Sequence, residues 1–370
     1  MIIPDLFPKF DGDVQGIFVL DYLTSTANYC NHKVLFGKLT FKKKEVLFEK
    51  NEHYDIYRFS VSDKKIPFYL KPFFYLNWFF KGYNIGKKIK NIDIIHAHGS
   101  ILSGTLAYML SKKLKVPFLI TEHQGPFSMT ADHFWKKHWT KFIMQKADAV
   151  LTVSEHLKQE ILNAGISPKK IIVSYNPVDT ELFKLKKNQL SNTILFVGRL
   201  DEFKGSLRCL KAFHQINQQY PHWKFKIVGD GQEMQSIINY INSNASIKPK
   251  VILRGLLSKP EIADEMQNSD FLVFPSKHES FGLVVTEALS SGLPVIVGNK
   301  TAPIEFVDAE NGLMVQYDDI HQIAHAMEMM IQNANNYQAE NIREKVIRNF
   351  SFENFGKNLV NTYKSFILKP

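Results

Sequence analysis

Two carboxylates in the second half of the chain carry most of its recognisable chemistry. Glu279 and Glu287 lie eight positions apart, and the tripeptide Phe281-Gly282-Leu283 stands between them. Ionised carboxylates do not bind phosphate, but they accept hydrogen bonds from hydroxyl groups. A carboxylate pair at this spacing is therefore suited to hold the hydroxyls of a sugar or a ribose.

The segment around these carboxylates is predicted to be a strand, a loop and a helix. Residues 271–275 form a short apolar run, which is typical of a buried strand. Glu279 then falls in the loop, and Glu287 falls in the helix. A loop that opens a helix presents backbone N–H groups and the positive end of the helix dipole, and both attract phosphate. Such backbone, flanked by carboxylates that bind hydroxyls, predicts a nucleotide-sugar site.

A second group of residues supplies positive charge at another strand end. Gly198 and Arg199 follow the apolar residues 193–197, and Lys204 comes five positions after Arg199, in front of Gly205. Gly198 leaves room for close approach of a ligand, and arginine and lysine together suit a diphosphate. Basic residues after a strand are more often solvated surface, so this prediction depends on the carboxylate pair.

Two further strands of the second half end in turns. Gly229-Asp230-Gly231 follows an apolar run, and glycines around an acid form either a plain turn or a thin wall of a binding cleft. Arg254 and Gly255 end the next strand, where their backbone groups are predicted to meet the edge of a base.

Histidines end two predicted strands of the first half. His96 and His98 lie on one face of a strand, because side chains alternate along strands. The sequence offers no third ligand at a helpful spacing, so we predict no metal site. His123 ends the next strand, where an active-site cleft would open; the alternative is a structural histidine. A loop with Gly12 and Gly16 leads into a helix and is predicted to face the same cleft.

The elements that position these residues follow from the alternation of apolar runs and amphipathic stretches. Predicted strands cover residues 33–40, 54–61, 93–98, 117–123, 149–154, 171–175, 193–197, 224–228, 251–254, 271–275 and 294–297. Predicted helices cover residues 100–113, 131–146, 155–164, 205–215, 232–242 and 259–267. The pattern predicts an α/β fold with two Rossmann-like, doubly wound domains that bind ligands at the carboxyl ends of their strands.

The length of 370 residues suits two domains. A polar stretch predicts the boundary, with one domain at residues 1–176 and another at 177–350. Residues 351–370 are predicted to form a helix that packs back on the first domain. Only Met1 to Ile3 precede Pro4, so the first strand is predicted to be nearly absent, either because it is very short or because the chain is clipped or mis-started. The glycine loop at residues 11–16 is then predicted to lack its usual support.

The net positive charge is concentrated in the first half. Residues 1–180 carry 25 basic and 16 acidic residues, whereas residues 181–370 carry 21 and 20. Residues 64–90 and 133–139 mix aromatics with lysines, which suits either an anionic membrane surface or a core with solvated lysines. Nucleic-acid binding is disfavoured, because no binding motif accompanies the charge.

Features of targeting and redox state point to the cytoplasm. No signal peptide is visible, and no apolar stretch approaches the roughly 18 residues of a membrane-spanning helix. Cys30 and Cys209 lie far apart without metal-like spacing, which predicts reduced thiols. We therefore expect a cytoplasmic protein, with a peripheral position on the inner face of the cell membrane as an open alternative.

Taken in order, these motifs resemble the retaining glycosyltransferases of family 4, which have the GT-B fold. The specific motifs are Gly198-Arg199, Lys204-Gly205, Gly229-Asp230-Gly231 and Glu279 with Glu287 around Phe281-Gly282-Leu283. The looser motifs are residues 11–16, 96–99, His123, 152–154 and 176–179. The resemblance covers nearly the whole chain. It implies two Rossmann-like domains that face a central cleft, the first binding the acceptor and the second the donor.

The resemblance also implies roles for the charged residues. Arg199 and Lys204 would hold the donor diphosphate and supply the charge that a metal supplies elsewhere, so neither a metal nor a cofactor is expected. Glu287 would bind the ribose hydroxyls, and Glu279 would bind hydroxyls of the donor sugar.

Further contacts are implied for the reacting sugar. Backbone groups at Phe281, Gly282 and Leu283 would touch the sugar and the phosphate. His123 would contact the transferred sugar near the reacting carbon.

The leading hypothesis is a retaining glycosyltransferase that moves a hexose-type sugar from a UDP- or GDP-sugar to a glycan or lipid-linked acceptor. The expected setting is bacterial surface polysaccharide, lipopolysaccharide or capsule synthesis. A sugar-nucleotide 2-epimerase of the same fold, which turns over the donor without an acceptor, is the alternative. A non-catalytic binding module is a third hypothesis, which the intact set of charged site residues disfavours.

Overall fold

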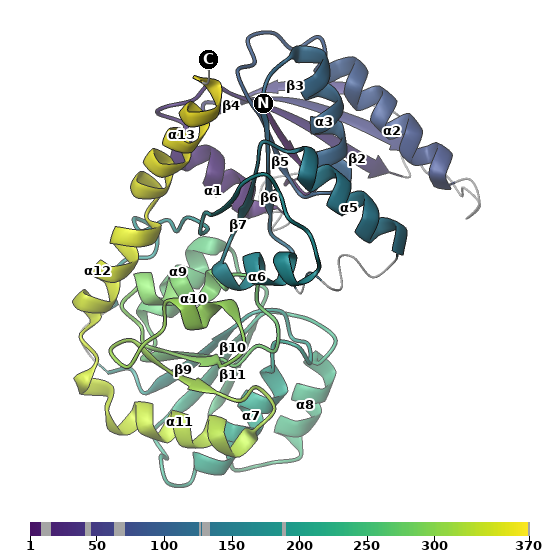
Figure 1. The fold of residues 1–370 in the computed structure, drawn as a ribbon. Helices are drawn as coiled ribbons and strands as arrows, with labels where there is room; N and C mark the ends of the chain where they lie inside the picture. The colour runs from purple at the N-terminus through teal and green to yellow at the C-terminus, as the bar shows by residue number, and fades with distance from the viewer. Residues whose placement is uncertain are drawn as a thin grey trace. The chain divides into compact units, whose positions relative to one another are not determined.

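The structure, a computed structural model, describes residues 1–8, 16–40, 46–62, 71–125, 127, 134–186 and 190–368. The chain divides into two compact units (Figure 1). Unit 1 comprises Met1–Pro177 and Phe355–Pro370, and unit 2 comprises Val178–Asn354. The sequence predicted the corresponding boundaries after residues 176 and 350.

Unit 1 is built on an eight-stranded sheet in the order β3-β4-β2-β1-β5-β6-β7-β8. Its strands are β1 (Ile2–Pro4), β2 (His32–Thr40), β3 (Val46–Lys50), β4 (Tyr54–Ser62), β5 (Ile95–His98), β6 (Phe118–Glu122), β7 (Ala149–Thr152) and β8 (Ile171–Val173). The edge strand β3 runs antiparallel to β4, and the other neighbouring strands are parallel. The sequence did not predict β3, because it is short and follows a charged run.

The first strand is present and very short, which agrees with one of the alternatives predicted from the sequence. β1 is fully buried and lies in the middle of the sheet, where Ile2 pairs with Val34 of β2 and with His96 of β5. Neighbours on both sides stabilise a strand of only three residues. Beyond the strand, the Asp5 N–H donates to the His98 carbonyl at 3.0 Å, so the chain leaves β1 beside the end of β5.

Helices cover both faces of this sheet. One face carries α1 (Ile17–Thr26) and α13 (Phe352–Ile367), and the other carries α2 (Lys71–Gly86), α3 (Leu102–Leu114) and α5 (Phe134–Lys146) (Figure 1). Helix α6 (Glu155–Asn163) connects β7 to β8. The rings of Tyr22 and Phe355 lie 4.5 Å apart, and a Cβ on Gly356 would lie 2.0 Å from the Ser25 carbonyl oxygen. The C-terminal helix therefore packs tightly on the first helix.

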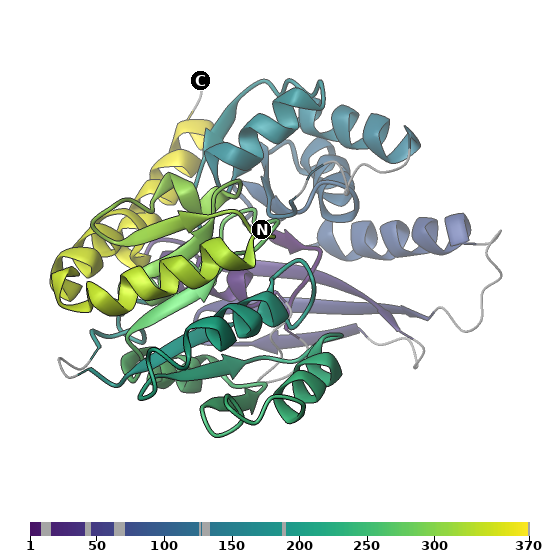
Figure 2. The same ribbon diagram turned by 90° about the horizontal axis from the view of Figure 1, so that it is seen from below.

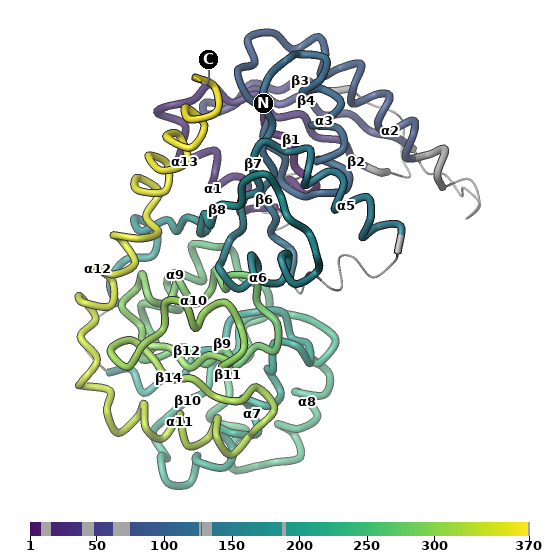
Figure 3. Tube along the Cα trace, viewed as in Figure 1, coloured from purple at the N-terminus to yellow at the C-terminus, as the bar shows by residue number. Residues whose placement is uncertain are grey.

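Unit 2 is built on a six-stranded parallel sheet in the order β11-β10-β9-β12-β13-β14. It lies in the part of the chain that is drawn from teal to yellow-green (Figures 2 and 3). Its strands are β9 (Thr193–Val197), β10 (Lys224–Val228), β11 (Val251–Gly255), β12 (Phe271–Phe274), β13 (Val295–Gly298) and β14 (Gly312–Val315). Its helices are α7 (Ser206–Ile216), α8 (Met234–Asn242), α9 (Lys259–Gln267), α10 (Leu283–Ser290), α11 (Ile320–Gln332) and α12 (Ala339–Phe350), with short 3₁₀ turns at Ala302–Glu305 and Ala334–Asn336. Helices α7, α8 and α11 lie on one side of the sheet, and α9 and α10 lie on the other (Figure 1).

Both sheets are doubly wound, which confirms the predicted α/β architecture. In unit 1 the chain winds outward in opposite directions from the pair β1 and β5, and in unit 2 from the pair β9 and β12. Ligands of doubly wound sheets bind at the carboxyl ends of strands where the winding reverses. These two places are therefore where binding residues are expected.

Candidate active site

The reversal point of unit 2 brings together two of the predicted site residues. Lys204 lies in the loop after β9, and its Nζ donates to Oε1 of Glu279 in the loop after β12. Their side chains are only 20% and 12% exposed. The two loops are also joined through backbone, since the Lys277 N–H donates to the Phe203 carbonyl at 2.7 Å. A cation and a carboxylate thus meet at the position where doubly wound sheets generally bind their ligands.

Asp201 organises the basic loop, and sequence reasoning missed it. Its Oδ2 accepts a hydrogen bond from Arg199 Nε, and its Oδ1 accepts the Lys204 backbone N–H at 3.0 Å. The Arg199 side chain remains 69% exposed. An acid between two predicted phosphate-binding residues was the available signal, because such an acid must either repel the ligand or order the loop.

The turn Gly229-Asp230-Gly231 is a point of close approach between two loops. Gly229 has φ +133°, and a Cβ there would lie 1.9 Å from the Gly198 carbonyl oxygen. A Cβ on Gly231 would lie 2.4 Å from the Leu200 carbonyl oxygen. The Leu200 N–H donates to the Asp230 carbonyl at 2.9 Å. Glycine is needed here because the backbone of the Gly198 loop occupies the space of a side chain.

Helix α10 begins at a second tightly approached glycine. Gly282 has φ +89°, and a Cβ there would lie 2.7 Å from Cγ of Pro303. Leu283 is the first residue of the helix, and Glu287 lies in its second turn. The predicted sequence of strand, loop and helix is therefore present, with the helix N-terminus beside the loop of Glu279.

The side chain of Phe281 belongs to the core of unit 2. It is 2% exposed and packs against Phe306 and Phe350, with ring centroids 5.4 and 5.8 Å away. This packing anchors the loop. Any contact of Phe281 with a ligand must be made by its backbone, as the family resemblance implies.

Arg254 is engaged in an internal ion-pair cluster. Its Nε donates to Glu265 Oε1 at 2.7 Å, and Lys226 Nζ donates to the other oxygen of the same carboxylate at 2.5 Å. The side chain therefore ties β11 to α9. The following Gly255 carbonyl accepts the Gly229 N–H at 2.8 Å, which places this strand end beside the glycine turn.

Unit 1 has a pocket of about 180 Å³ at its own reversal point, at the ends of β1, β5 and β6. The pocket is lined by Asp5, Leu6, Phe18, His98, Gly99, Ser100, Ile101, Glu122, His123 and Gln124. It contains both histidines that the sequence predicted for this domain's site.

His98 and His123 form a stacked, hydrogen-bonded pair. His98 Nδ1 lies 2.9 Å from His123 Nε2, and the rings are inclined by 11°. Phe18 lies 4.3 Å from the His123 ring, between centroids. Burial lowers the pKa of His98 to about 3 and lowers the pKa of His123 well below its ordinary value. Both imidazoles are therefore neutral near pH 7 and act as hydrogen-bonding groups.

His96 has a structural role. Its Nδ1 lies 2.6 Å from the Tyr363 hydroxyl of α13, and its Nε2 lies 2.6 Å from the Thr121 hydroxyl. Both ring nitrogens are occupied, although His96 and His98 share a strand face. Within the described residues, no three His, Cys, Asp or Glu side chains are grouped to hold a metal ion.

Glu122 positions the His123 loop, and sequence reasoning missed it. Its Oε1 accepts the N–H groups of His123 and Gln124 at 3.1 Å each, and its Oε2 accepts the Ser100 hydroxyl. Burial raises the pKa of this carboxyl. An acid at the end of a buried apolar strand was the signal available in the sequence.

Asp5 also lines the pocket, and sequence reasoning missed it as well. Its Oδ1 accepts the Ser103 N–H at 2.9 Å at the start of α3. A Cβ on Gly99 would lie 2.1 Å from Asp5 Oδ2, so this carboxyl packs directly on the backbone. Burial raises the pKa of Asp5, and the hydrogen bonds from Ser103 oppose this effect.

The glycine loop before α1 is only partly described. Gly16 has φ +76°, and a Cβ there would lie 2.5 Å from the Leu6 carbonyl oxygen. Because Leu6 lines the pocket, Gly16 lies next to it. Gly12 lies outside the described residues.

None of the helices in the described parts of the chain is long and apolar enough to cross a membrane.

Solved structures identify the class of this fold. The sucrose-phosphate synthase of Thermosynechococcus elongatus superposes with a TM-score of 0.82 at 20% identity, covering 98% of each chain. The HepE protein of Anabaena in complex with UDP gives a TM-score of 0.74 at 17% identity, covering 98% of this chain and 99% of that one. The fold is therefore GT-B, the class that the family resemblance implied.

Sequence comparison identifies the family. Residues 177–349 match the family described as Glycosyl transferases group 1, and residues 38–182 match Glycosyltransferase Family 4. The chain belongs to the family 4 glycosyltransferases, which confirms the resemblance seen in its motifs.

Two relatives cover about three quarters of the chain. An uncharacterized glycosyltransferase of Methanocaldococcus jannaschii is 27% identical over 290 residues, which are 77% of this chain and 78% of the relative. The UDP-Gal:alpha-D-GlcNAc-diphosphoundecaprenol alpha-1,3-galactosyltransferase of Escherichia coli is 29% identical over 290 residues, which are 73% and 74%. Both family descriptions and both relatives name glycosyltransferases, so these comparisons do not support the alternative of a sugar-nucleotide 2-epimerase.

Proposed function

We propose that this glycosyltransferase moves a hexose-type sugar from a nucleoside diphosphate sugar to a glycan or lipid-linked acceptor, with retention of anomeric configuration. One observation carries the proposal. At the reversal point of unit 2, the Lys204 ammonium and the Glu279 carboxylate meet beside the N-terminus of α10. A cation and a helix N-terminus suit a diphosphate, and a carboxylate suits sugar hydroxyls.

The named partners of similar proteins support this donor and acceptor. The Escherichia coli relative is named for galactose transfer from UDP-Gal to a diphosphoundecaprenol-linked sugar. HepE was solved with UDP. By analogy, a uridine nucleotide sugar and a lipid-linked acceptor of bacterial polysaccharide synthesis are the first candidates for this chain.

The proposed roles follow the geometry and the family resemblance. Lys204 and Arg199 hold the diphosphate, and backbone at residues 281–283 approaches the sugar and phosphate. Glu279 accepts hydrogen bonds from hydroxyls of the donor sugar, and Glu287 does so from the ribose. In the other unit, the neutral His123 contacts the transferred sugar.

Charge stabilisation dominates the proposed mechanism. Cleavage of the anomeric C–O bond produces an oxocarbenium-like sugar and a diphosphate leaving group. The two basic side chains and the α10 N-terminus stabilise the negative charge as it grows, a contribution that is often the largest in catalysis. The acceptor hydroxyl attacks from the face that the leaving group vacates, and a phosphate oxygen takes its proton. No metal is needed, because Arg199 and Lys204 supply the charge.

A thermal-shift screen tests the donor site. UDP, GDP and their common sugar conjugates are added with and without EDTA. At about 100 times the dissociation constant, a ligand of the native state contributes about 2.7 kcal/mol, or about 5–10 °C in Tm for a unit of this size. We expect a shift with one nucleotide class that EDTA leaves unchanged. No shift with any nucleotide would overturn the donor site, and a shift abolished by EDTA would overturn metal independence.

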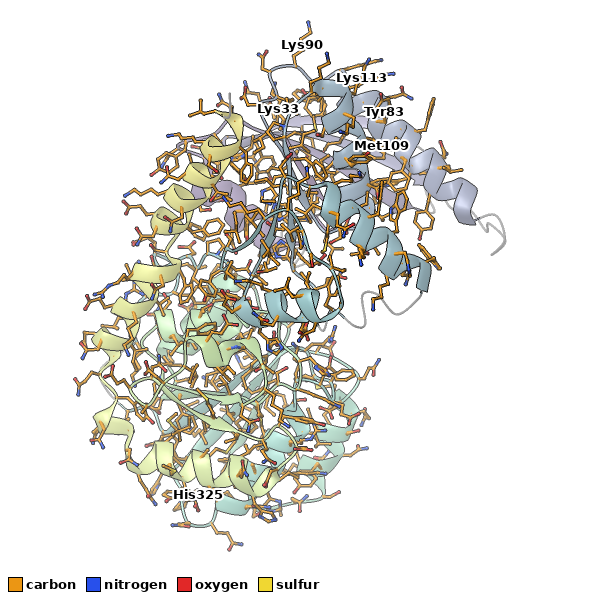
Figure 4. All side chains as sticks on the ribbon, viewed as in Figure 1. Lys33, Tyr83, Lys90, Met109, Lys113 and His325 are labelled. Atoms are coloured by element: carbon orange, nitrogen blue, oxygen red, sulfur yellow. The ribbon has the colours of Figure 1, made fainter. Side chains whose placement is uncertain are left out.

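A lipid-linked acceptor requires access to a membrane, and one face of unit 1 suits this task. Helices α2, α3 and α5 lie side by side and contain no Asp or Glu. Figure 4 shows Tyr83 of α2 and Met109 and Lys113 of α3 on this outer side. Among the described side chains of α2 and α5, the exposed large apolar ones are Tyr75, Leu76, Phe80, Trp135, Trp139 and Phe142. We propose that this face, named the basic aromatic face, contacts an anionic membrane.

Vesicle flotation tests the basic aromatic face. At low salt, we expect the protein to float with vesicles containing phosphatidylserine and to remain behind with neutral vesicles. The double variant Phe80→Ser/Trp135→Ser should bind at least about tenfold more weakly, because two exposed apolar anchors are lost. Leu256→Ser, which removes a 75% exposed leucine from unit 2, is the control and should bind normally. Absence of flotation with anionic vesicles would refute membrane contact through this face.

A further inference from the structure

The proposed diphosphate site neutralises its own cations. Arg199 Nε donates to Asp201, and Lys204 Nζ donates to Glu279. Each of the two basic side chains that are proposed to hold the diphosphate is therefore already bound to an acid. A nucleotide must compete with these acids for the cations.

The two ion pairs differ in what they do. The pair of Arg199 and Asp201 is local, and the arginine is 69% exposed, so solvent weakens the contact. The pair of Lys204 and Glu279 joins two loops and is mostly buried, with 20% and 12% of the side chains exposed. Its cation also lies 5.5 Å from the centroid of the Phe274 ring.

Backbone contacts hold the second pair in place. The Phe203 carbonyl, next to Lys204, accepts the Lys277 N–H at 2.7 Å and the Ser276 hydroxyl at 3.2 Å. The loop of Glu279 is thereby fixed against the loop of Lys204. A phosphate that draws Lys204 away leaves the carboxylate near by, in a place with little solvent to screen it.

The cost of leaving that carboxylate depends on the ligand. An intact nucleotide sugar offers hydroxyls to Glu279 while its diphosphate takes Lys204, so both partners of the broken pair are compensated. A nucleoside diphosphate lacks the donor sugar, and its ribose hydroxyls are assigned to Glu287, so the Glu279 carboxylate faces the phosphate uncompensated. Like charges at a poorly solvated site repel each other strongly.

We propose that Glu279 discriminates the intact donor from the spent nucleoside diphosphate by competing for Lys204. Before transfer, hydroxyls of the donor sugar donate hydrogen bonds to the Glu279 carboxylate, and Lys204 is free to bind the diphosphate. After transfer, the sugar has left, Glu279 recaptures Lys204, and the nucleoside diphosphate loses a cation and dissociates. This inference rests on the proposed donor site and assigns to Glu279 a role in product release as well as in sugar binding.

Calorimetric titration with UDP and GDP tests the inference. We expect Glu279→Gln to bind the preferred nucleoside diphosphate about tenfold more tightly than the wild type, because the glutamine keeps the size and loses the charge. Glu279→Ala should also bind the nucleoside diphosphate more tightly than the wild type. This second variant keeps the test valid if Glu279→Gln fails to fold. The ratio of donor affinity to diphosphate affinity should fall in both.

Two further variants separate this role from a general effect of charge. Glu310 precedes β14, at the amino end of the sheet, and its carboxylate binds Lys345. Glu310→Gln removes this carboxylate and should leave UDP affinity unchanged. When Lys204 is already replaced by alanine, Glu279→Gln should raise the affinity for the nucleoside diphosphate only by removing a nearby negative charge. Its gain should therefore be clearly smaller than in the wild type.

The outcomes are distinguishable. If the wild type binds neither UDP nor GDP, the proposed donor site and the inference both fail. If the wild type binds one of them and Glu279→Gln binds it no more tightly, the competition between Glu279 and the nucleotide is refuted, while the donor site stands.

Discussion

Replacing Lys204 with alanine is expected to lower kcat/KM by about 100- to 1,000-fold, the effect of removing one preorganised group that stabilises charge in a transition state. Lys204 is the largely buried cation at the reversal point of unit 2. The loss should exceed that of Arg199→Ala, because Arg199 is mostly exposed. The measurement is steady-state transfer with the nucleotide sugar found in the thermal-shift screen.

Lys226→Ala is the matched control for this variant. Lys226 is 14% exposed and binds a Glu265 carboxylate that is 11% exposed, so removing it also breaks a buried lysine–glutamate pair of unit 2. Its loss should change kcat/KM by less than about threefold, since rate effects require contact with the reacting charge. Near wild-type turnover of both Lys204→Ala and Arg199→Ala would refute the assignment of the donor site.

Replacing Gly229 with alanine is expected to destabilise unit 2 by about 2–4 kcal/mol, because the new Cβ cannot be placed without moving backbone. The Cβ would lie 1.9 Å from the Gly198 carbonyl oxygen, and the φ of +133° disfavours any side chain. The Tm of the unit should fall by about 5–15 °C. Nucleotide affinity should fall as well, because the displaced carbonyl belongs to the loop that leads to Arg199.

Gly255→Ala separates steric overlap from backbone preference. Gly255 has φ +67°, but nothing lies within 4 Å of the position of its Cβ. This variant should cost only about 1 kcal/mol, the conformational penalty of alanine in the left-handed region. Equal losses of Tm in the two variants, measured by scanning calorimetry, would show that the close approach of Gly198 and Gly229 contributes nothing.

The regular elements were largely predictable because they depend on patterns within a short stretch of chain. The predicted strands at residues 193–197 and 224–228 coincide with β9 and β10. Several other ends differ by one or two residues, because capping decides where an element stops. The predicted strand at residues 149–154, for example, ends at Thr152, and Ser154 instead caps α6 by accepting the Leu157 N–H at 3.0 Å.

Two strands were missed because their stability is not local. β14 has four residues and is an edge strand that pairs with β13. β3 is an edge strand that pairs with β4 in the antiparallel direction. Neither segment has a long apolar run, so no pattern within it indicated a strand.

The types of the site residues could be inferred from the sequence, because they follow strand ends and strand ends meet at one edge of a parallel sheet. Their partners could not be inferred. Lys204 and Glu279 are 75 residues apart, and His96 and Tyr363 are 267 residues apart. Similar strand ends in one sequence do not reveal which loops lie next to each other.

The sequence by itself therefore determined the fold class, the family and which residues are proposed to bind a diphosphate and a sugar, since each depends on residue type and local order. The tertiary structure alone decided that Lys204 is bound to Glu279 and that Asp201 orders the loop of Lys204. It also decided that Glu122 orders the loop of His123 and that His96 is structural. Those facts depend on distances between segments that are remote in sequence, and packing of the sheets and helices sets such distances.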